Sequence, residues 1–112
     1  DKVISESSVL ILGYTFKENC ADTRNTKVKD IYDGLLRSSC RVSIYDPYLL
    51  PDSDNNFINS PFESDQKYDA IIVAVAHNEF LNYTIADFNQ LTKGKLVLLD
   101  LKGIYEKSTW KL

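Results

Sequence analysis

The residues best suited to chemistry lie in one long connection, residues 13–26, between an apolar run and a helical pattern. Strand-to-helix connections usually have about 2 to 6 residues, so this length indicates a functional loop. Lys17 and Arg24 supply positive charge, and Phe16 supplies a flat apolar face. With the N-terminus of the following helix they suit a phosphorylated aromatic ligand such as a nucleotide. The alternative is that both cations are solvated and pair with carboxylates of the same loop.

Four other polar residues allow chemistry, and each also has an ordinary structural explanation. Cys20 and His77 form a thiolate–imidazole pair, or they are a plain loop cysteine and a histidine that caps a strand end. Asp46 lies where a Rossmann domain keeps its ribose-binding acid, or it begins a turn with Pro47. Lys102 is a cation for an anionic ligand, or it is a turn lysine. The residues alone leave these alternatives open.

The usual phosphate-binding and metal-binding motifs are missing. The dinucleotide fingerprint G-x-G-x-x-G needs three glycines after the first strand, where only Gly13 is present. A P-loop needs Gly-Lys-Ser/Thr, whereas the chain has Gly94-Lys95-Leu96. One histidine and no C-x-x-C pair leave no ligand set for a structural zinc ion. We therefore expect no metal site, and no NAD site built by this chain alone.

Composition and charge narrow the classes of partner. The 112 residues include 13 basic and 16 acidic side chains, for a net charge of −3. Nucleic acids and anionic membranes are bound through clusters of Lys and Arg, so we expect neither as a partner. The longest apolar run, residues 70–76, is far shorter than the roughly 20 residues of a membrane span. Two cysteines without a visible leader favour thiols in a reducing compartment, which predicts a cytoplasmic protein.

Short apolar runs predict the strands of a sheet. Runs bounded by Gly, Pro or Asp predict buried strands at residues 9–12, 41–45, 70–76 and 95–99. The continuous apolar character of the third run is typical of a central parallel strand. Residues 47–68 are predicted to be a surface loop with one helical turn near residues 53–58. Residues 109–112 are predicted to add an edge strand.

Two helices are predicted between these strands. A helical stripe predicts a helix over residues 27–39, with Asn25 and Thr26 as N-cap types; its apolar residues are Val28, Ile31, Tyr32, Leu35 and Leu36. Thr84 and Asp87 have the spacing of a capping box before a shorter helix, whose inner face is Ile85, Phe88 and Leu91. Alternation of strands and helices predicts right-handed parallel crossovers.

These elements predict a single domain over residues 1–112. The fold class is α/β, a doubly wound, three-layer, Rossmann-like domain with a mostly parallel sheet of four to five strands. In such sheets ligands bind outside the carboxyl ends of the strands. The long loop and the segments after the other strands should therefore line one edge.

The long loop resembles a specific family signature. It fits G-x-[TS]-F-K-x-x-x-x-D-x-R-x-[ST], which opens the C-terminal domain of the UDP-glucose/GDP-mannose dehydrogenase family. Other segments agree in order and spacing, namely Tyr45-Asp46-Pro47, residues 68–70 and 73–80, and Asp100-Leu101-Lys102-Gly103. The chain is identified as a member of this family. It looks most like the branch that oxidises UDP-N-acetylhexosamines to uronic acids for surface polysaccharide.

The resemblance implies roles for four residues. Phe16 and Lys17 match positions that contact the UDP-sugar, and Lys102 matches a basic position near the nucleotide-sugar. Arg24 matches a position that reaches the cofactor side of the cleft. Cys20 does not match the catalytic cysteine, which the family keeps upstream with its acid–base partners. We therefore expect no catalytic residue in this chain.

The expected function is that of one domain in a longer enzyme. The resemblance implies the UDP-sugar-binding C-terminal domain of an NAD-dependent UDP-sugar 6-dehydrogenase, with NAD bound mainly by an N-terminal Rossmann domain. The expected partners are the UDP-sugar, the N-terminal and central domains, and further copies in a homo-oligomer. A chain without methionine fits a piece of a longer protein. The alternative is a non-catalytic, ligand-responsive or oligomerisation α/β module without a nucleotide site.

Overall fold

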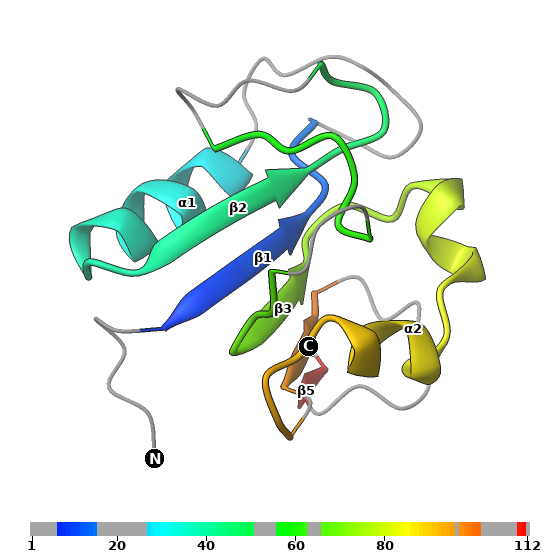
Figure 1. Ribbon diagram of the computed structural model, residues 1–112. Helices are drawn as coiled ribbons and strands as arrows, with labels where there is room; N and C mark the ends of the chain where they lie inside the picture. Colours follow the sequence, from blue (N-terminus) through cyan, green and yellow to red (C-terminus); the bar gives the residue numbers. More distant parts are fainter. Residues whose placement is uncertain are drawn as a thin grey trace.

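A parallel β-sheet forms the centre of the fold (Figure 1). The structure is a computed structural model that describes residues 7–15, 27–50, 56–62, 66–95, 97–101 and 110–111. The strands are β1 (Ser8–Leu12), β2 (Arg41–Tyr45), β3 (Ala70–Val73), β4 (Leu98–Asp100) and β5 (Trp110–Lys111). The helices are α1 (Val28–Arg37), the 3-10 helix η3 (Asn78–Asn82) and α2 (Ile85–Gln90). The strands lie in the order β2-β1-β3-β4-β5, and each neighbouring pair is parallel.

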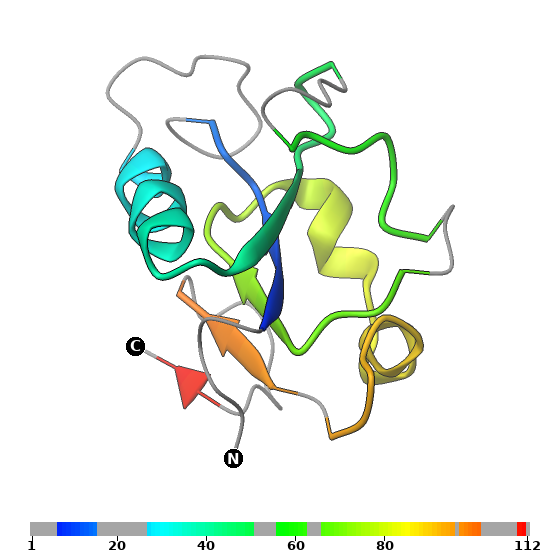
Figure 2. The same cartoon turned by 60° about the vertical axis from the view of Figure 1, so that its left-hand side comes forward.

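Helices cover both faces of this sheet and make three layers (Figure 2). α1 lies on one face and α2 on the other. Because successive side chains of a strand point to opposite faces, β1 contributes alternate residues to two cores. Leu10 belongs to the same buried cluster as Phe88 of α2, whereas Ile11 belongs to the cluster that contains Val28 of α1. The predicted α/β, Rossmann-like architecture with four to five parallel strands is confirmed.

The first helix begins and ends differently from the prediction. Lys27 occupies the N-cap position without a side-chain hydrogen bond, so the prediction of Asn25 or Thr26 as the N-cap is wrong. The side chain of lysine has no acceptor, so only the backbone carbonyl of Lys27 contributes at the N-cap, where it accepts the Asp30 N–H at 3.1 Å. Leu36 of the predicted apolar stripe is 41% exposed, because the helix buries a narrower face than the pattern indicated. Beyond the helix, Ser39 adopts a left-handed φ of 64°, which ends the helical path.

The second helix follows its sequence signals. The Thr84 hydroxyl accepts a hydrogen bond from the Asp87 N–H at 3.2 Å, and the Asp87 carboxylate accepts one from the Thr84 N–H at 2.9 Å. This reciprocal pair confirms the predicted capping box. Phe88 and Leu91 are buried, as predicted for the inner face. Within the described part of the chain, no helix has the length and apolar composition needed to cross a bilayer.

Two predicted strands are shorter in the structure. β3 ends at Val73 rather than at residue 76, because its partner β1 ends at Leu12 and offers no further ladder. β4 begins at Leu98 rather than at residue 95, since residues 93–95 form a bend. The predicted edge strand is confirmed in β5.

The segment after β2 returns to the sheet instead of forming the predicted helical turn. Residues 51–55 lie outside the described residues. In the described remainder, Asn56 has a left-handed φ of 64°, which is incompatible with a helical turn, and Phe57 forms a parallel bridge with Ile44 of β2. Ile44 donates its N–H to the carbonyl of Asn56 and accepts the N–H of Ile58, both at 2.8 Å. The helical-turn prediction is therefore wrong over residues 56–58.

Candidate functional site

The carboxyl ends of three strands meet at one edge of the sheet (Figure 1). In the strand register, Leu12 of β1 lies beside both Tyr45 of β2 and Val73 of β3. The segments that follow these strands therefore start side by side, as predicted. Open parallel sheets bind their ligands at this edge, because the following loops converge there.

The chain turns sharply at Gly13 as it leaves β1. The φ of Gly13 is +97°, a region that residues with a Cβ rarely adopt. A Cβ at this position would lie 2.6 Å from the Cβ of Val75 and 2.9 Å from its backbone nitrogen. The Gly13 N–H donates to the carbonyl of Tyr45 at 2.8 Å. Only glycine therefore allows the loop to start this close to the segment after β3.

A buried carboxylate directly after β2 holds the first residues of the loop. Asp46 Oδ2 accepts hydrogen bonds from the backbone N–H groups of Tyr14, at 2.7 Å, and Thr15, at 3.2 Å. Asp46 Oδ1 accepts the N–H of Tyr48 at 2.9 Å, which confirms that Asp46 begins a turn with Pro47. One side chain thus joins the ends of two neighbouring strands.

His77 adds a link from the segment after β3. Its Nε2 lies 2.9 Å from Asp46 Oδ2 and 3.0 Å from the hydroxyl oxygen of Thr15. Because an ionised carboxylate only accepts hydrogen bonds, Nε2 carries the hydrogen of the bond to Asp46, and the Thr15 hydroxyl oxygen can only share this hydrogen as a second acceptor. The side chains of Asp46 and His77 are both fully buried. We call Asp46, His77, Tyr14 and Thr15 the edge anchor.

Aromatic rings pack against the imidazole of the edge anchor. The ring centroids of Tyr48 and Phe80 lie 4.6 Å and 5.5 Å from that of His77. Phe80 is fully buried, whereas the hydroxyl of Tyr48 donates to the carboxylate of the exposed Glu79 at 3.3 Å. This packing fixes the orientation of the imidazole and keeps water away from its hydrogen bonds.

The environment of Asp46 keeps its carboxyl group ionised. Burial by itself raises its pKa, but hydrogen bonds from His77 and from the N–H groups of Tyr14 and Tyr48 favour the charged form and hold the pKa below its ordinary value. A carboxylate offers about four acceptor sites, and Asp46 receives N–H groups from four residues. Three of these N–H groups point to Oδ2 and one to Oδ1, and the side chain is fully buried, so the carboxylate is not open to a ribose hydroxyl or a substrate proton. Asp46 is therefore a holding residue, and the ribose-binding alternative has no support.

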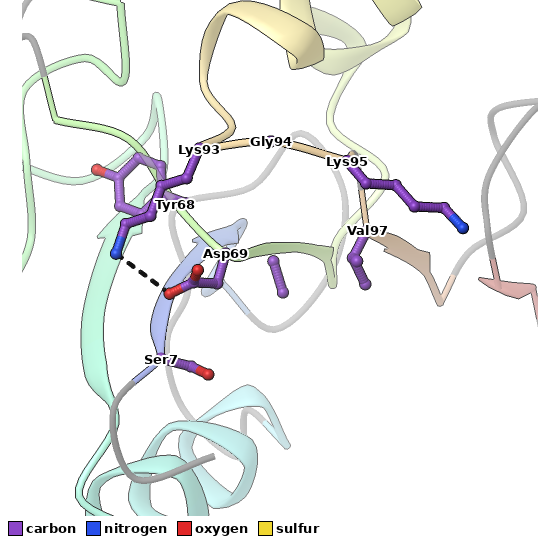
Figure 3. Close-up of a pocket in the computed structure, with 8 residues that line it drawn as sticks. Ser7, Tyr68, Asp69, Lys93, Gly94, Lys95 and Val97 are labelled. Carbon is purple, nitrogen blue, oxygen red and sulfur yellow. Dashed lines mark hydrogen bonds and ion pairs between the residues drawn. The ribbon is translucent and has the colours of Figure 1, made fainter. Parts of the chain in front are cut away.

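A pocket of about 480 Å³ lies at the opposite, amino edge of the sheet (Figure 3). Its lining includes Ser7, Tyr68, Asp69, Lys93, Lys95 and Val97. Asp69 Oδ2 accepts the N–H of Ser8 at 2.7 Å, and the Lys93 ammonium lies 3.3 Å from the same oxygen. Lys95 points away from Asp69 in Figure 3. Because the pocket lies at the amino ends of the strands, the topology favours the carboxyl edge as the nucleotide site.

Comparison with known protein families assigns the chain. Residues 10–107 match the sequence profile described as "UDP-glucose/GDP-mannose dehydrogenase family, UDP binding domain". The matched span contains the whole long loop and all of β2, β3 and β4. The chain belongs to the UDP-glucose/GDP-mannose dehydrogenase family. The resemblance found in the sequence is thereby confirmed.

Relatives in this family have closely similar sequences and folds. The chain is 43% identical to a UDP-N-acetyl-D-glucosamine 6-dehydrogenase from Salmonella typhi, over 90% of this chain and 24% of the relative. It is 39% identical to the Pseudomonas aeruginosa protein of the same name, over 93% of this chain and 25% of the relative. The solved structure of a UDP-D-ManNAc dehydrogenase from Pyrococcus horikoshii matches with a TM-score of 0.81 at 25% identity. The match covers 96% of this chain and 24% of the solved chain. The chain thus spans about a quarter of the length of the relatives it matches.

The residues predicted to contact ligands lie outside the described residues. These are Phe16, Lys17, Arg24 and Lys102, and Cys20 lies outside as well. The residues directly before two of them are described. Thr15 precedes Phe16 in the edge anchor, and Leu101 precedes Lys102 at the end of β4, where its N–H donates to the carbonyl of Val73 at 3.0 Å. The described flanks of the two predicted segments therefore approach the end of β3 from both sides.

Sequence reasoning missed the partnership of Asp46 and His77. The sequence suggests a ribose-binding acid or a turn starter for Asp46, and a strand cap or a partner of Cys20 for His77, but nothing in it pairs the two residues. A signal was nevertheless present, because each of them directly follows an apolar run predicted to be a strand. Polar residues at the carboxyl ends of neighbouring parallel strands meet at one edge. Which of them contact each other depends on side-chain packing that spacing does not contain.

Proposed function

We propose that this chain is the UDP-sugar-binding domain of a longer, NAD-dependent UDP-sugar 6-dehydrogenase. The observation that carries the proposal is the match of residues 10–107 to the UDP binding domain of the family. The chain spans about a quarter of its relatives, so the activity belongs to the longer enzyme. That enzyme oxidises the C6 alcohol of a UDP-hexose or UDP-N-acetylhexosamine to a uronic acid for surface polysaccharide. Relatives named as UDP-N-acetylhexosamine dehydrogenases support the N-acetylhexosamine branch.

Four residues of this chain are proposed to contact the ligands. Phe16, Lys17 and Lys102 bind the UDP-sugar, and Arg24 reaches the cofactor side of the cleft. The positions of Phe16, Lys17 and Arg24 in the family signature, and that of Lys102 in the matching segment at residues 100–103, support these roles. The described flanks support them too, because Thr15 and Leu101 lie at the edge where parallel sheets bind ligands. The two lysines supply charge-assisted hydrogen bonds for a diphosphate, and the phenylalanine ring supplies an apolar face.

The described carboxyl edge does not fit an NAD site of its own. The turn after β1 carries only Gly13 where the dinucleotide fingerprint needs three glycines. The carboxylate at the end of β2, Asp46, uses its acceptor sites within the protein. We infer that NAD is bound mainly by an upstream domain, and that the nucleophile and the acid–base groups also lie outside this chain.

The partners follow from the role of one domain in a larger enzyme. We infer that residues 1–112 act as one unit that packs against N-terminal and central domains, in an enzyme that assembles as a homo-oligomer in the cytoplasm. Family membership supports the multidomain enzyme. The net charge of −3 supports the absence of nucleic acid and anionic membranes among its partners.

The test is an assay of the full-length enzyme that contains this chain. We expect NADH formation with NAD and a UDP-N-acetylhexosamine or UDP-glucose, and calorimetric binding of UDP. The 112-residue chain alone should form no NADH with the same substrates at any pH, because it lacks the nucleophile. NADH formation by the pure chain, unaffected by Cys20→Ser, would show that the domain assignment is wrong. A full-length protein that neither binds UDP nor reduces NAD would favour the non-catalytic module.

A further inference from the structure

The edge anchor fixes the point at which the signature loop leaves the sheet. The N–H groups of Tyr14 and Thr15 donate to Asp46, and the Thr15 hydroxyl lies 3.0 Å from Nε2 of His77. Thr15 is therefore held through both its backbone and its side chain, and it is only 1% exposed. Phe16 follows directly after Thr15 in the signature. The edge anchor therefore fixes the backbone position and direction from which the rest of the signature begins.

The edge anchor has little freedom to move. The side chains of Asp46 and His77 are fully buried, and the rings of Tyr48 and Phe80 pack against the imidazole. The turn at Gly13 passes in close contact with the segment after β3. Packed interiors of this kind resist small displacements, so the start of the loop has one well-defined direction.

We propose that Asp46 and His77 are positioning residues for nucleotide-sugar binding. They hold the backbone from which Phe16 and Lys17 follow, and they act through that backbone because their own side chains are buried in the protein. The inference rests on the proposed function, since it takes the two following residues as ligand contacts. Without the anchor, the backbone of Tyr14 and Thr15 is no longer held in one orientation, and part of the binding free energy has to be spent on ordering it.

The amino edge supplies a matched control for this proposal. Asp69 is also buried and also accepts a backbone N–H, from Ser8 at 2.7 Å. Its cation is Lys93, at 3.3 Å. Asp69 lies at the opposite end of the strands from the signature loop. A general loss of stability affects both carboxylates, whereas a positioning effect is specific to Asp46 and His77.

The experiment measures steady-state kinetics of the full-length enzyme and three variants. We expect His77→Ala to raise the KM for the UDP-sugar about tenfold, with kcat at saturation changed less than about threefold. His77→Gln retains an N–H near the position of Nε2, so its KM should return to within about threefold of the unaltered enzyme. Asp69→Asn should leave the KM within about twofold of the unaltered value. Thermal unfolding of each variant is recorded beside the kinetics.

A milder variant keeps the proposal testable where His77→Ala does not fold. Thr15→Val has a similar volume and removes only the hydroxyl near His77, and it should raise the KM about threefold. A KM for His77→Ala or Thr15→Val equal to that of Asp69→Asn overturns the positioning role, as does a loss of kcat at unchanged KM. The proposed function fails separately, when the unaltered full-length enzyme neither binds UDP in calorimetry nor reduces NAD.

Discussion

The two ends of the sheet each hold a buried aspartate, and the protein uses the two residues differently. At the carboxyl edge, Asp46 is 2% exposed and receives four N–H groups, one of them from the buried His77. At the amino edge, Asp69 is 7% exposed and pairs with Lys93, whose side chain is 42% exposed. The first aspartate belongs to a closed network, whereas the second borders a pocket that opens to solvent.

The fold depends more strongly on one set of hydrogen bonds at the carboxyl edge than at the amino edge. Removing one member of a closed polar network leaves the others buried without partners, which is costly. An ion pair with an exposed partner is screened by water, so its loss costs little. The network at the carboxyl edge can therefore fix the backbone of Tyr14 and Thr15, the first described residues after the Gly13 turn, in one orientation. At the amino edge, the Asp69 carboxylate accepts the first N–H of β1.

The largest difference is expected for the glycines of the two edges. Gly13→Ala places a Cβ 2.6 Å from the side chain of Val75 at a φ of +97°, so it should lower the free energy of unfolding by about 3 kcal/mol. Gly94→Ala, at the amino-edge pocket, meets nothing within 4 Å and should change it by no more than about 0.5 kcal/mol. Urea unfolding of the 112-residue chain measures both values. Equal losses of unfolding free energy in Gly13→Ala and Gly94→Ala would contradict the expected difference between the two edges.

The next effect is expected at the two aspartates. Asp46→Asn keeps the volume but turns an amide towards N–H donors, so we expect a loss of about 2 to 3 kcal/mol in the free energy of unfolding. Asp69→Asn should lower the free energy of unfolding by about 1 kcal/mol, because the ammonium group of its lysine partner can be solvated instead. Urea unfolding followed by circular dichroism gives both numbers. The contrast fails when Asp69→Asn is as damaging as Asp46→Asn.

Lys17 of the signature loop and Lys95 of the amino edge should differ in their effect on binding. Lys17 is proposed to make a charge-assisted contact worth about 1.5 to 3 kcal/mol, so Lys17→Ala should raise the KM for the UDP-sugar roughly tenfold or more in the full-length enzyme. Arg24→Ala should weaken NAD more than the UDP-sugar. Lys95→Ala at the amino edge is the control, and its constants should stay unaltered. A folded Lys17→Ala, Arg24→Ala double variant with unaltered constants for both substrates would remove the basis for the binding loop.

The smallest effect is expected in the pH dependence of stability. The pKa of Asp46 lies below its ordinary value, so Asp46 contributes stability above the unfolded pKa of about 3.9 and loses this contribution as the pH falls through the folded pKa. The stability difference between the unaltered chain and Asp46→Asn should therefore shrink below about pH 4. Urea unfolding at a series of pH values measures it. A constant difference down to the acid transition would show that Asp46 is not held in its charged form.

Local signals were enough to predict most of the fold. The apolar run that includes Leu10 predicted β1, and the spacing of Thr84 and Asp87 predicted the capping box of α2. These features depend on neighbours in sequence, so the pattern contains them. The errors arose where a distant partner decided the structure. Phe57 pairs with Ile44 of β2, and residues 74–76 lie outside the sheet because β1 ends at Leu12, the partner of Val73.

The location of the candidate site was predictable from the sequence, but its side-chain contacts were not. Topology alone predicted that the segments after Leu12 and Tyr45 share one edge, and the register confirms it. The contacts of Asp46 with His77 and Thr15 join residues about thirty positions or more apart in sequence. No spacing rule links such residues, because their distance depends on how three strands are packed. The ligand roles of Lys17 and its neighbours stay predictions.

The bridge between Phe57 and Ile44 has a consequence for association between copies of the protein. β2 is the outer strand of the sheet, and both backbone groups of Ile44 are already hydrogen-bonded to the segment at residues 56–58. Unpaired outer strands invite other chains to add to the ladder, which leads to aggregation. An incoming strand would first have to displace this segment from the middle of β2. At the other side of the sheet, β5 is only two residues long and offers a very short ladder.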